Sequence, residues 1–382
     1  MTRSRPGEGD GGAREPRADQ VGSLLRPPEL RRAWERFLAG RLDRDALTEI
    51  EDRAIVTALE RQRSIGLDVY TDGEFRRAAY MTGVTDAVEG FSPSQTGPRL
   101  PWRADPGREV PPEVASFTLP IVSARLRPRR RIAAHEAAFL RAHAPGPFKV
   151  TLPSPVHFAP RSFLPGVTDR VYDSPSELTR DLATILAEEA ASLARAGVGY
   201  VQVDSPTYSA WLAEDLPARR GDGIDAGQRL AEAIAADNAI LDAARAGGAL
   251  TALHVCRGNA SGAWLTSGGY EPIAERVFGE LRCDRLLLEY DTERAGGFGP
   301  LRLVPAPRVV VLGLVTTKYG RLESRDELLR RIEAATAFLP VERLALSPQC
   351  GFASNFRGNP LTEDEQWRKL ELVASVAREV WG

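Results

Sequence analysis

Four side chains of the sequence could together hold a zinc ion: His254, Cys256, Glu289 and Cys350. Zinc takes imidazole, thiolate and carboxylate ligands in a tetrahedron. His-x-Cys alone is a weak signal, because a lone cysteine is usually a small buried hydrophobe and a lone histidine a hydrogen-bonded core residue. The set gains weight because each member lies at the end of, or just after, an apolar run typical of a β-strand. We therefore predict a zinc site where several strands end.

The distribution of these ligands favours a catalytic zinc over a structural one. Structural sites are usually closed sets of Cys and His at short local spacings, whereas this set runs from His254 to Cys350 and includes a carboxylate. A catalytic zinc can bind a substrate thiol as a thiolate, lowering a pKa that is about 8.5 in the free thiol. Two thiolates and a carboxylate keep such a sulfur electron-rich. The chemistry that this predicts is attack of sulfur on carbon.

A second group of polar residues follows the ends of other expected strands: Asp72 and Glu74 in TDGEF, Asp204 in VQVDSP, and Gly22 and Ser23 in QVGSLLRP. Two carboxylates that face one pocket are costly unless a cation shares it. One interpretation is that nearby arginines pair with them, namely Arg76, Arg77 and Arg257. The other is that Glu74 and Asp204 bind a substrate ammonium.

The elements that must position these residues alternate along the chain, a short apolar strand followed by an amphipathic helix. Such alternation predicts parallel βα units. We expect about eight strands, the number that closes a single (β/α)8 TIM barrel, whose active site lies where the strands end. The expected strands are 20–24, 67–71, 148–152, 199–203, 250–254, 285–289, 308–313 and 343–346. The main expected helices are 43–65, 176–195, 225–246, 270–281, 324–338 and 363–381.

Two segments lie outside this regular pattern. Residues 1–17 are rich in Gly, Arg, Glu, Asp and Pro, which predicts a disordered tail before a barrel over 18–382. Residues 77–147, after the second strand, contain several prolines and the apolar run VASFTLPIVSARL, and we expect an inserted arm that includes a hairpin. Its basic run RLRPRRR is better explained by a solvated or subunit-contact face than by nucleic-acid binding.

The composition favours a small-molecule partner. The chain has 382 residues, 43% of them hydrophobic, and 50 basic residues are balanced by 52 acidic ones, so no net field gathers nucleic acid or an anionic membrane. No apolar run reaches the length of a membrane span or a signal peptide. The three cysteines are too few for a disulfide framework, which favours a reducing, cytoplasmic compartment. Cys283 precedes its strand, so we expect it to pack rather than to bind metal.

At these motifs the sequence resembles the catalytic barrel of cobalamin-independent methionine synthase, and more closely its short single-barrel relatives. The resemblance runs from about Ala18 to Trp381, through ADQVGSLLRP, GLDVYTDGEFRR, YVQVDSP, LHVCRGN, LLEYDTERAGGFGPL, LALSPQCGFAS and GNPLTEDEQWRKL. It implies that zinc is bound by His254, Cys256, Glu289 and Cys350 and that homocysteine accepts a methyl group. It also implies that Glu74 and Asp204 hold the substrate ammonium and that the main chain at Ser23 holds its carboxylate.

The sequence departs from this family where the methyl donor binds. The family's stacking tryptophan is absent from KVTLPSPVHF, and its histidine after the seventh strand is replaced by Thr316, Thr317 and Lys318. The chain also has no room for the second barrel that helps to bind polyglutamyl folate. We therefore expect another donor, such as a corrinoid protein, another methyl donor or an electrophile such as an epoxide.

Three interpretations stay open. The first is a zinc-dependent thiol methyltransferase, or another thiol S-alkyltransferase that uses an epoxide or forms a C–S bond in a natural product. The second is a carbon–carbon lyase or decarboxylase of the related uroporphyrinogen decarboxylase superfamily, and the third a non-catalytic zinc- or thiol-binding barrel. The donor, the acceptor, the pathway and the oligomeric state, a homo-oligomer included, stay open as well.

Overall fold

The computed structural model describes residues 15–93, 100–115, 118–212 and 225–382. Its centre is a parallel sheet in which strands β3 to β8 pair in sequence order. Most of these strands are buried along their whole length, as expected for a sheet covered on both faces. They are β3 (Lys149–Pro153), β4 (Tyr200–Asp204), β5 (Leu250–Val255), β6 (Arg285–Glu289), β7 (Val309–Val315) and β8 (Leu344–Pro348).

Two short extended segments close the sheet into a barrel. Ala18 forms a parallel bridge with Leu346 of β8, and Tyr70 forms one with Phe148 beside β3. The Asp68 amide donates to the Ala18 carbonyl at 3.1 Å, which joins the two segments. The fold is thus the expected α/β TIM-type barrel, and its first two positions each contribute a single bridge.

The predicted first strand over 20–24 is wrong in position, because the pairing occurs at residues 17–19 instead. Gly22 takes a positive φ of 153°, a conformation outside the extended strand region for other residues. The chain therefore leaves the ladder at this point and turns toward the cavity described below.

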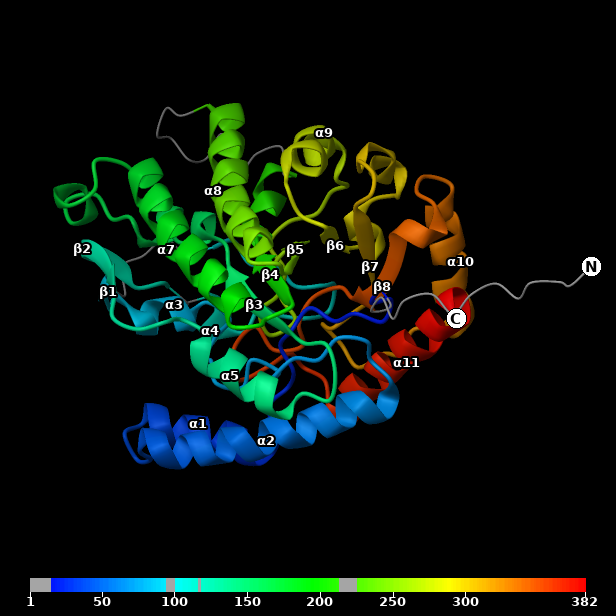
Figure 1. Cartoon of the computed structure of the whole chain (residues 1–382), viewed down its shortest axis with the longest axis horizontal. Helices are drawn as coiled ribbons and strands as arrows, with labels where there is room; N and C mark the ends of the chain where they lie inside the picture. Colours follow the sequence, from blue (N-terminus) through cyan, green and yellow to red (C-terminus); the bar gives the residue numbers. More distant parts are fainter. Residues whose placement is uncertain (1–14, 94–99, 116–117, 213–224) are drawn as a thin grey trace, which may run out of the picture.

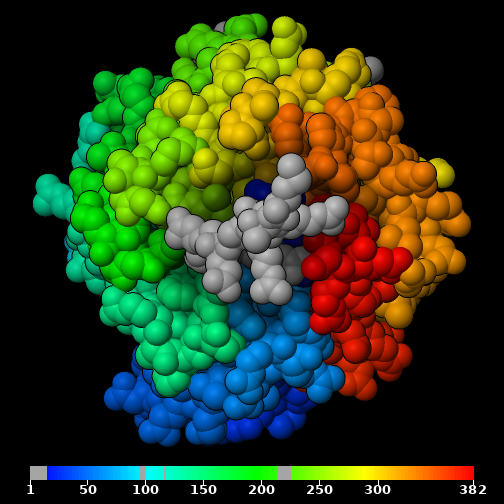
Figure 2. Space-filling model, turned by 45° about the vertical axis from the view of Figure 1, so that its right-hand side comes forward, coloured from blue at the N-terminus to red at the C-terminus, as the bar shows by residue number. Residues whose placement is uncertain are grey.

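Helices surround the sheet in chain order. In Figure 2 consecutive segments follow one another around the molecule, from the blue N-terminal helices at the bottom through green and yellow to red. Asp43 caps the helix that starts at Arg44, by accepting from the Ala46 amide, and Gly66 ends it in the left-handed region. The α-helices are α1 (Pro28–Leu38), α2 (Arg44–Ile65), α3 (Thr82–Ala87), α4 (Pro112–Ala115), α5 (Ala134–His143), α6 (Ala159–Ser162), α7 (Pro175–Arg195), α8 (Ala226–Ala246), α9 (Glu271–Glu280), α10 (Arg325–Thr336) and α11 (Glu363–Trp381).

The segment between the second barrel position and β3 contains an antiparallel hairpin. It consists of β1 (Val88–Ser92) and β2 (Ile121–Pro128), which lie at the side of the molecule near α7 in Figure 1. Short 3-10 helices connect other elements: η1 (Pro155–His157), η2 (Thr168–Arg170), η3 (Pro206–Trp211), η4 (Glu293–Ala295), η5 (Gly299–Leu303) and η6 (Val341–Arg343). Within the described residues, no helix combines the length and apolarity that crossing a membrane requires.

Candidate metal and substrate site

Three of the four predicted metal ligands meet at the ends of β5 and β8. One ligand atom each of His254, Cys256 and Cys350 lies within 4.8 Å of the other two, and all three atoms are buried. The Nδ1 atom of His254 lies 3.3 Å from the Leu287 carbonyl, whereas its buried Nε2 atom has no hydrogen-bond partner among the described residues. Because the carbonyl can only accept, Nδ1 carries the proton and Nε2 presents a lone pair.

The three groups perturb one another's pKa values. A hydrogen bond from Cys256, aided by the nearby His254, holds the pKa of the Cys350 thiol well below its usual range. The same hydrogen bond, together with burial, raises the pKa of Cys256 well above 9. Burial lowers the pKa of His254, but the nearby Cys350 and the charges of Asp204 and Glu289 outweigh it and raise that pKa overall.

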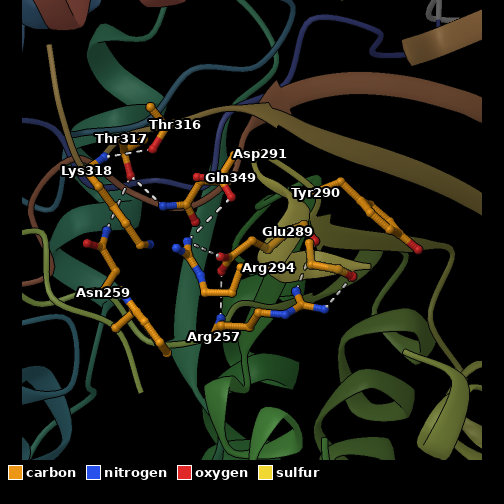
Figure 3. Close-up of polar contacts among 12 residues, drawn as sticks. Arg257, Asn259, Glu289, Tyr290, Asp291, Arg294, Thr316, Thr317, Lys318 and Gln349 are labelled. Carbon is orange, nitrogen blue, oxygen red and sulfur yellow. Dashed lines mark hydrogen bonds and ion pairs between the residues drawn. The ribbon is translucent and has the colours of Figure 1, made fainter. Parts of the chain in front are cut away.

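Glu289, the fourth predicted ligand, is not part of this group. It ends β6 as expected and is fully buried, but its Oε2 accepts from the Arg257 amide at 2.7 Å and its Oε1 from Arg294 Nη2 at 3.2 Å. Figure 3 shows the carboxylate between these two arginines. The physical reason is charge: burial raises the pKa of Glu289, but Lys318, Arg257 and Arg294 outweigh it and keep that pKa below 4.5.

Lys318 and Asp291 complete this charged environment, and the sequence analysis did not assign a role to either. The Lys318 ammonium is buried and donates to the Gly258 carbonyl at 3.3 Å, and its charge lowers the pKa values of Cys350 and Glu289. Both carboxylate oxygens of Asp291 are buried without a hydrogen-bond partner in the described structure, although Arg294 Nη2 lies 3.8 Å from one of them. Burial and the charge of Glu289 raise the pKa of Asp291.

Glu74 and Asp204 line the same cavity as the metal ligands. Glu74 has a left-handed backbone with φ 55°, which is uncommon for a residue with a side chain and concentrates at functional sites. Its Oε1 accepts from Thr151 at 2.8 Å, and its buried Oε2 has no partner among the described residues. Burial raises the pKa of Asp204 to about 7. The charge of His254 acts against this increase, and the charge of Glu74 adds to it.

The nearby arginines are largely committed elsewhere. Arg76 contacts Asp52, and Arg77 binds Glu136 through two nitrogens, while its distance to Glu74 is 3.8 Å. Arg257 donates to the carbonyls of residues 268, 289 and 295. Within the described residues, no ion pair is formed by Asp204. Pairing with arginines therefore neutralises Glu74 only in part, and among the described residues it does not neutralise Asp204.

The cavity has a volume of about 280 Å³. Of the predicted substrate-binding residues, Ser23, Glu74 and Asp204 line it, whereas Gly22 and Asp72 do not. Asp72 and Gly22 lie beside it, at a small pocket below Glu74. Asp72 Oδ1 accepts from the Glu74 amide at 2.8 Å, so it supports the turn that presents Glu74. Gly351 allows the first and last barrel positions to approach, since a Cβ there would lie 1.9 Å from Ser23 Oγ.

The donor set fits zinc better than a hard cation. Two sulfur atoms and one imidazole nitrogen with a free lone pair are ligands that select zinc or a similar soft metal over Mg²⁺ or Ca²⁺. Cys283 is also buried but does not belong to the group, and it lies before β6, as expected for a packing residue.

Comparisons with known proteins identify the family. The model of the cobalamin-independent synthase catalytic domain matches residues 165–378. The chain belongs to the cobalamin-independent methionine synthase-like family. The chain is 35% identical to uncharacterized protein YxjH of Bacillus subtilis. The alignment covers 96% of this chain and 94% of YxjH. The 5-methyltetrahydropteroyltriglutamate–homocysteine methyltransferase of Nitratidesulfovibrio vulgaris is 28% identical over 87% of the chain, which spans 38% of that longer protein.

Solved structures show the same fold. A Listeria monocytogenes protein assigned as a vitamin-B12-independent methionine synthase aligns with a TM-score of 0.72 at 26% identity, over 96% of this chain and 98% of that one. A B12-independent methionine synthase from Shewanella sp. W3-18-1 aligns with the same TM-score at 20% identity, over 95% and 96% of the two chains.

Proposed function

We propose that the protein is a zinc-dependent methyltransferase that transfers a methyl group to the thiol of a homocysteine-like amino acid. The observation that carries this proposal is one cavity that contains both the His254, Cys256 and Cys350 group and the two carboxylates Glu74 and Asp204. The first set suits a thiol-binding metal, and the second suits an ammonium group.

Each residue has a defined task in this proposal. His254, Cys256 and Cys350 would hold zinc, which when bound lowers the pKa of a substrate thiol so that its sulfur is a nucleophile at neutral pH. Glu74 Oε2 and Asp204 bind the substrate ammonium, because both are buried without a cation that neutralises them fully. Ser23 lines the same cavity. Its main chain would hold the substrate carboxylate.

Glu289 would serve as the fourth metal ligand in this proposal, in exchange for its hydrogen bond with Arg294. The exchange costs one charge-assisted hydrogen bond, about 1.5–3 kcal/mol. Arg294 would keep Asp291 as a partner, because that carboxylate lies 3.8 Å from its Nη2 and has no other ion pair in the described structure. Structural zinc energies of about 10–16 kcal/mol exceed this cost.

The test compares two cysteine variants. Cys350→Ser should lose tight zinc binding and homocysteine methylation together, because a neutral oxygen replaces a thiolate whose charge holds the metal. Cys283→Ser, which changes a buried thiol outside the group, should keep both. Metal content is measured after dialysis, followed by product analysis with homocysteine and a set of methyl donors. Equal zinc loss in both variants, or full methylation by zinc-free protein, would contradict the proposal.

A further inference from the structure

Tyr80 and His157 form a polar pair in a part of the cavity wall that the thiol chemistry above does not use. Both line the cavity together with Arg161. The Tyr80 hydroxyl lies 2.8 Å from His157 Nε2, and Arg161 Nη1 is within hydrogen-bond distance of the same imidazole ring. The same cavity is lined by Cys256 and Cys350, so the phenol and these two thiols share one cavity.

The position of Tyr80 is fixed by the same loop that carries Cys350. The Tyr80 amide donates to the Ser354 carbonyl at 3.0 Å, and Ala79 forms an antiparallel bridge with Asn355. The loop that follows β8 thus places one metal ligand and, through these backbone contacts, the phenol. Tyr80 is therefore held relative to the metal group by main-chain bonds rather than by a mobile side chain.

The donors and acceptors of His157 and Arg161 determine where the Tyr80 hydroxyl proton points. A neutral imidazole has one acceptor nitrogen and one N–H. Burial and the charge of Arg161 hold the pKa of His157 well below 6.5, so its ring is neutral. Arg161 Nη1 lies close to both ring nitrogens and can only donate, whereas the Tyr80 hydroxyl is nearer to Nε2, at 2.8 Å, than to Nδ1, at 3.2 Å. We therefore assign the lone pair to Nδ1, which accepts from Arg161, and the N–H to Nε2, which donates to the Tyr80 oxygen. The Tyr80 proton then has no acceptor in this pair and is available to a ligand in the cavity.

The wall of the cavity as a whole is mainly apolar. Its side chains come from the arm, from the loop after β5 and from the loop after β8: Met81, Leu100, Trp102, Leu119, Leu265 and Phe356. In such surroundings a single hydrogen-bond donor is worth more than in water and selects ligands that accept it. A cavity of about 280 Å³ also favours a compact ligand.

We propose that the Tyr80 hydroxyl, oriented by His157 and Arg161, binds the second substrate, a compact apolar alkyl donor whose leaving atom is an oxygen or a nitrogen. This inference rests on the proposed function. In the step, a bond forms between the thiol sulfur and the donor carbon, and the bond from that carbon to the leaving atom breaks. The electron pair stays on the leaving atom, which accepts the Tyr80 hydrogen bond. The thiol loses one proton and the leaving atom gains one, so the reaction balances.

The experiment compares two electrophiles on zinc-loaded protein with homocysteine. Propylene oxide leaves an alkoxide that needs a hydrogen bond, whereas methyl iodide leaves iodide, which does not. Tyr80→Phe should slow alkylation by propylene oxide by about 100-fold, the scale for loss of one donor to a developing oxyanion, and leave methyl iodide nearly unchanged. Tyr70→Phe, which removes a phenol hydroxyl outside the cavity, is the control and should affect neither reaction.

The two arms separate this inference from the function on which it rests. If methyl iodide shows no zinc-dependent methylation of homocysteine, the proposed function fails and the inference with it. If methyl iodide reacts but propylene oxide does not, or if Tyr80→Phe changes both rates by the same factor, the role of Tyr80 is refuted and the proposed function stands. Zinc content and circular dichroism of Tyr80→Phe exclude a folding defect.

Discussion

The carboxylate of Glu289 has two competing sets of partners, namely Arg257 and Arg294 on one side and the proposed metal on the other. Glu289→Gln keeps the shape of the side chain but removes its charge, so zinc affinity should fall about tenfold or more if this residue joins the metal. Glu293→Gln, at an exposed position four residues away, is the control and should leave the affinity within about threefold. Competition with a chelator measures both. Equal affinities of Glu289→Gln and the wild type would exclude Glu289 as a ligand.

Asp204 gives the substrate pocket a pH dependence. Its pKa is raised from 3.8 to about 7, mainly by burial. Between these two pH values the Asp204 carboxyl keeps its proton in the folded protein, whereas the same group in an unfolded chain has lost it. Asp204 therefore destabilises the fold increasingly as pH rises from about 4 to about 7. A bound ammonium favours the ionised carboxylate. The preference for homocysteine over 4-mercaptobutyrate, which has the same thiol and no amine, should increase roughly tenfold between pH 6 and pH 8.

Calorimetric titration of the zinc-loaded protein with both thiols measures this preference. Asp204→Asn should flatten the pH dependence, because an amide does not titrate in this range. A preference for homocysteine that is the same at both pH values would show that Asp204 does not contact the amine. Glu74→Gln should weaken homocysteine binding at both pH values, by about 2 kcal/mol.

The residues of the site were predictable where a strand end fixes them. His254, Cys256 and Cys350 lie together because strand ends of a barrel gather at one mouth, a rule that needs no side-chain detail. The orientation of Glu289 was not predictable, because it depends on Arg294 and Lys318, which approach from other loops. Tyr80 and His157 were missed for a related reason, since each lies in a loop after a strand and their contact spans 77 residues of sequence.

At the scale of elements, β3 to β8 and most helices agree with the sequence pattern to within one or two residues. A capping box of Thr362 with Glu365 starts α11, at the expected position. The first two barrel positions were less accurate, because each pairs through one bridge and the apolar pattern cannot distinguish such a segment from a full strand. The course of the inserted arm could not be predicted either, because it is set by contacts with distant loops.

Asp105 is the main polar contact between that arm and the barrel mouth. Its carboxylate accepts from Trp264 at 2.9 Å and Tyr319 at 2.6 Å, and it lies 3.4 Å from Arg294. Asp105→Ala should therefore increase amide hydrogen exchange in residues 100–115 by about 10- to 100-fold, since charged hydrogen bonds of about 1.5–3 kcal/mol are lost, while the barrel strands stay protected. The exposed Glu109 of the same segment provides the control, Glu109→Ala. Unchanged exchange in Asp105→Ala would show that apolar packing alone holds the arm.

For the whole molecule, the proposed metal links strands that are distant in the chain. His254 and Cys256 belong to the end of β5 and Cys350 to the loop after β8, so an ion shared by them restrains half of the barrel. Because the ligands converge only in the folded state, zinc should stabilise that state by RT ln(1 + [Zn]/Kd), about 2.7 kcal/mol at a hundredfold excess over Kd.

The unfolding temperature of wild-type protein and of Cys283→Ser should therefore rise with added zinc and fall with a chelator, whereas that of Cys350→Ser should not respond. The effect should weaken as pH drops, because Cys256 and His254 have raised pKa values and protons then compete with the metal. Scanning calorimetry at pH 8 and pH 6 measures it, and a zinc response that is the same at both pH values, or that persists in Cys350→Ser, would contradict this assignment of the ligands.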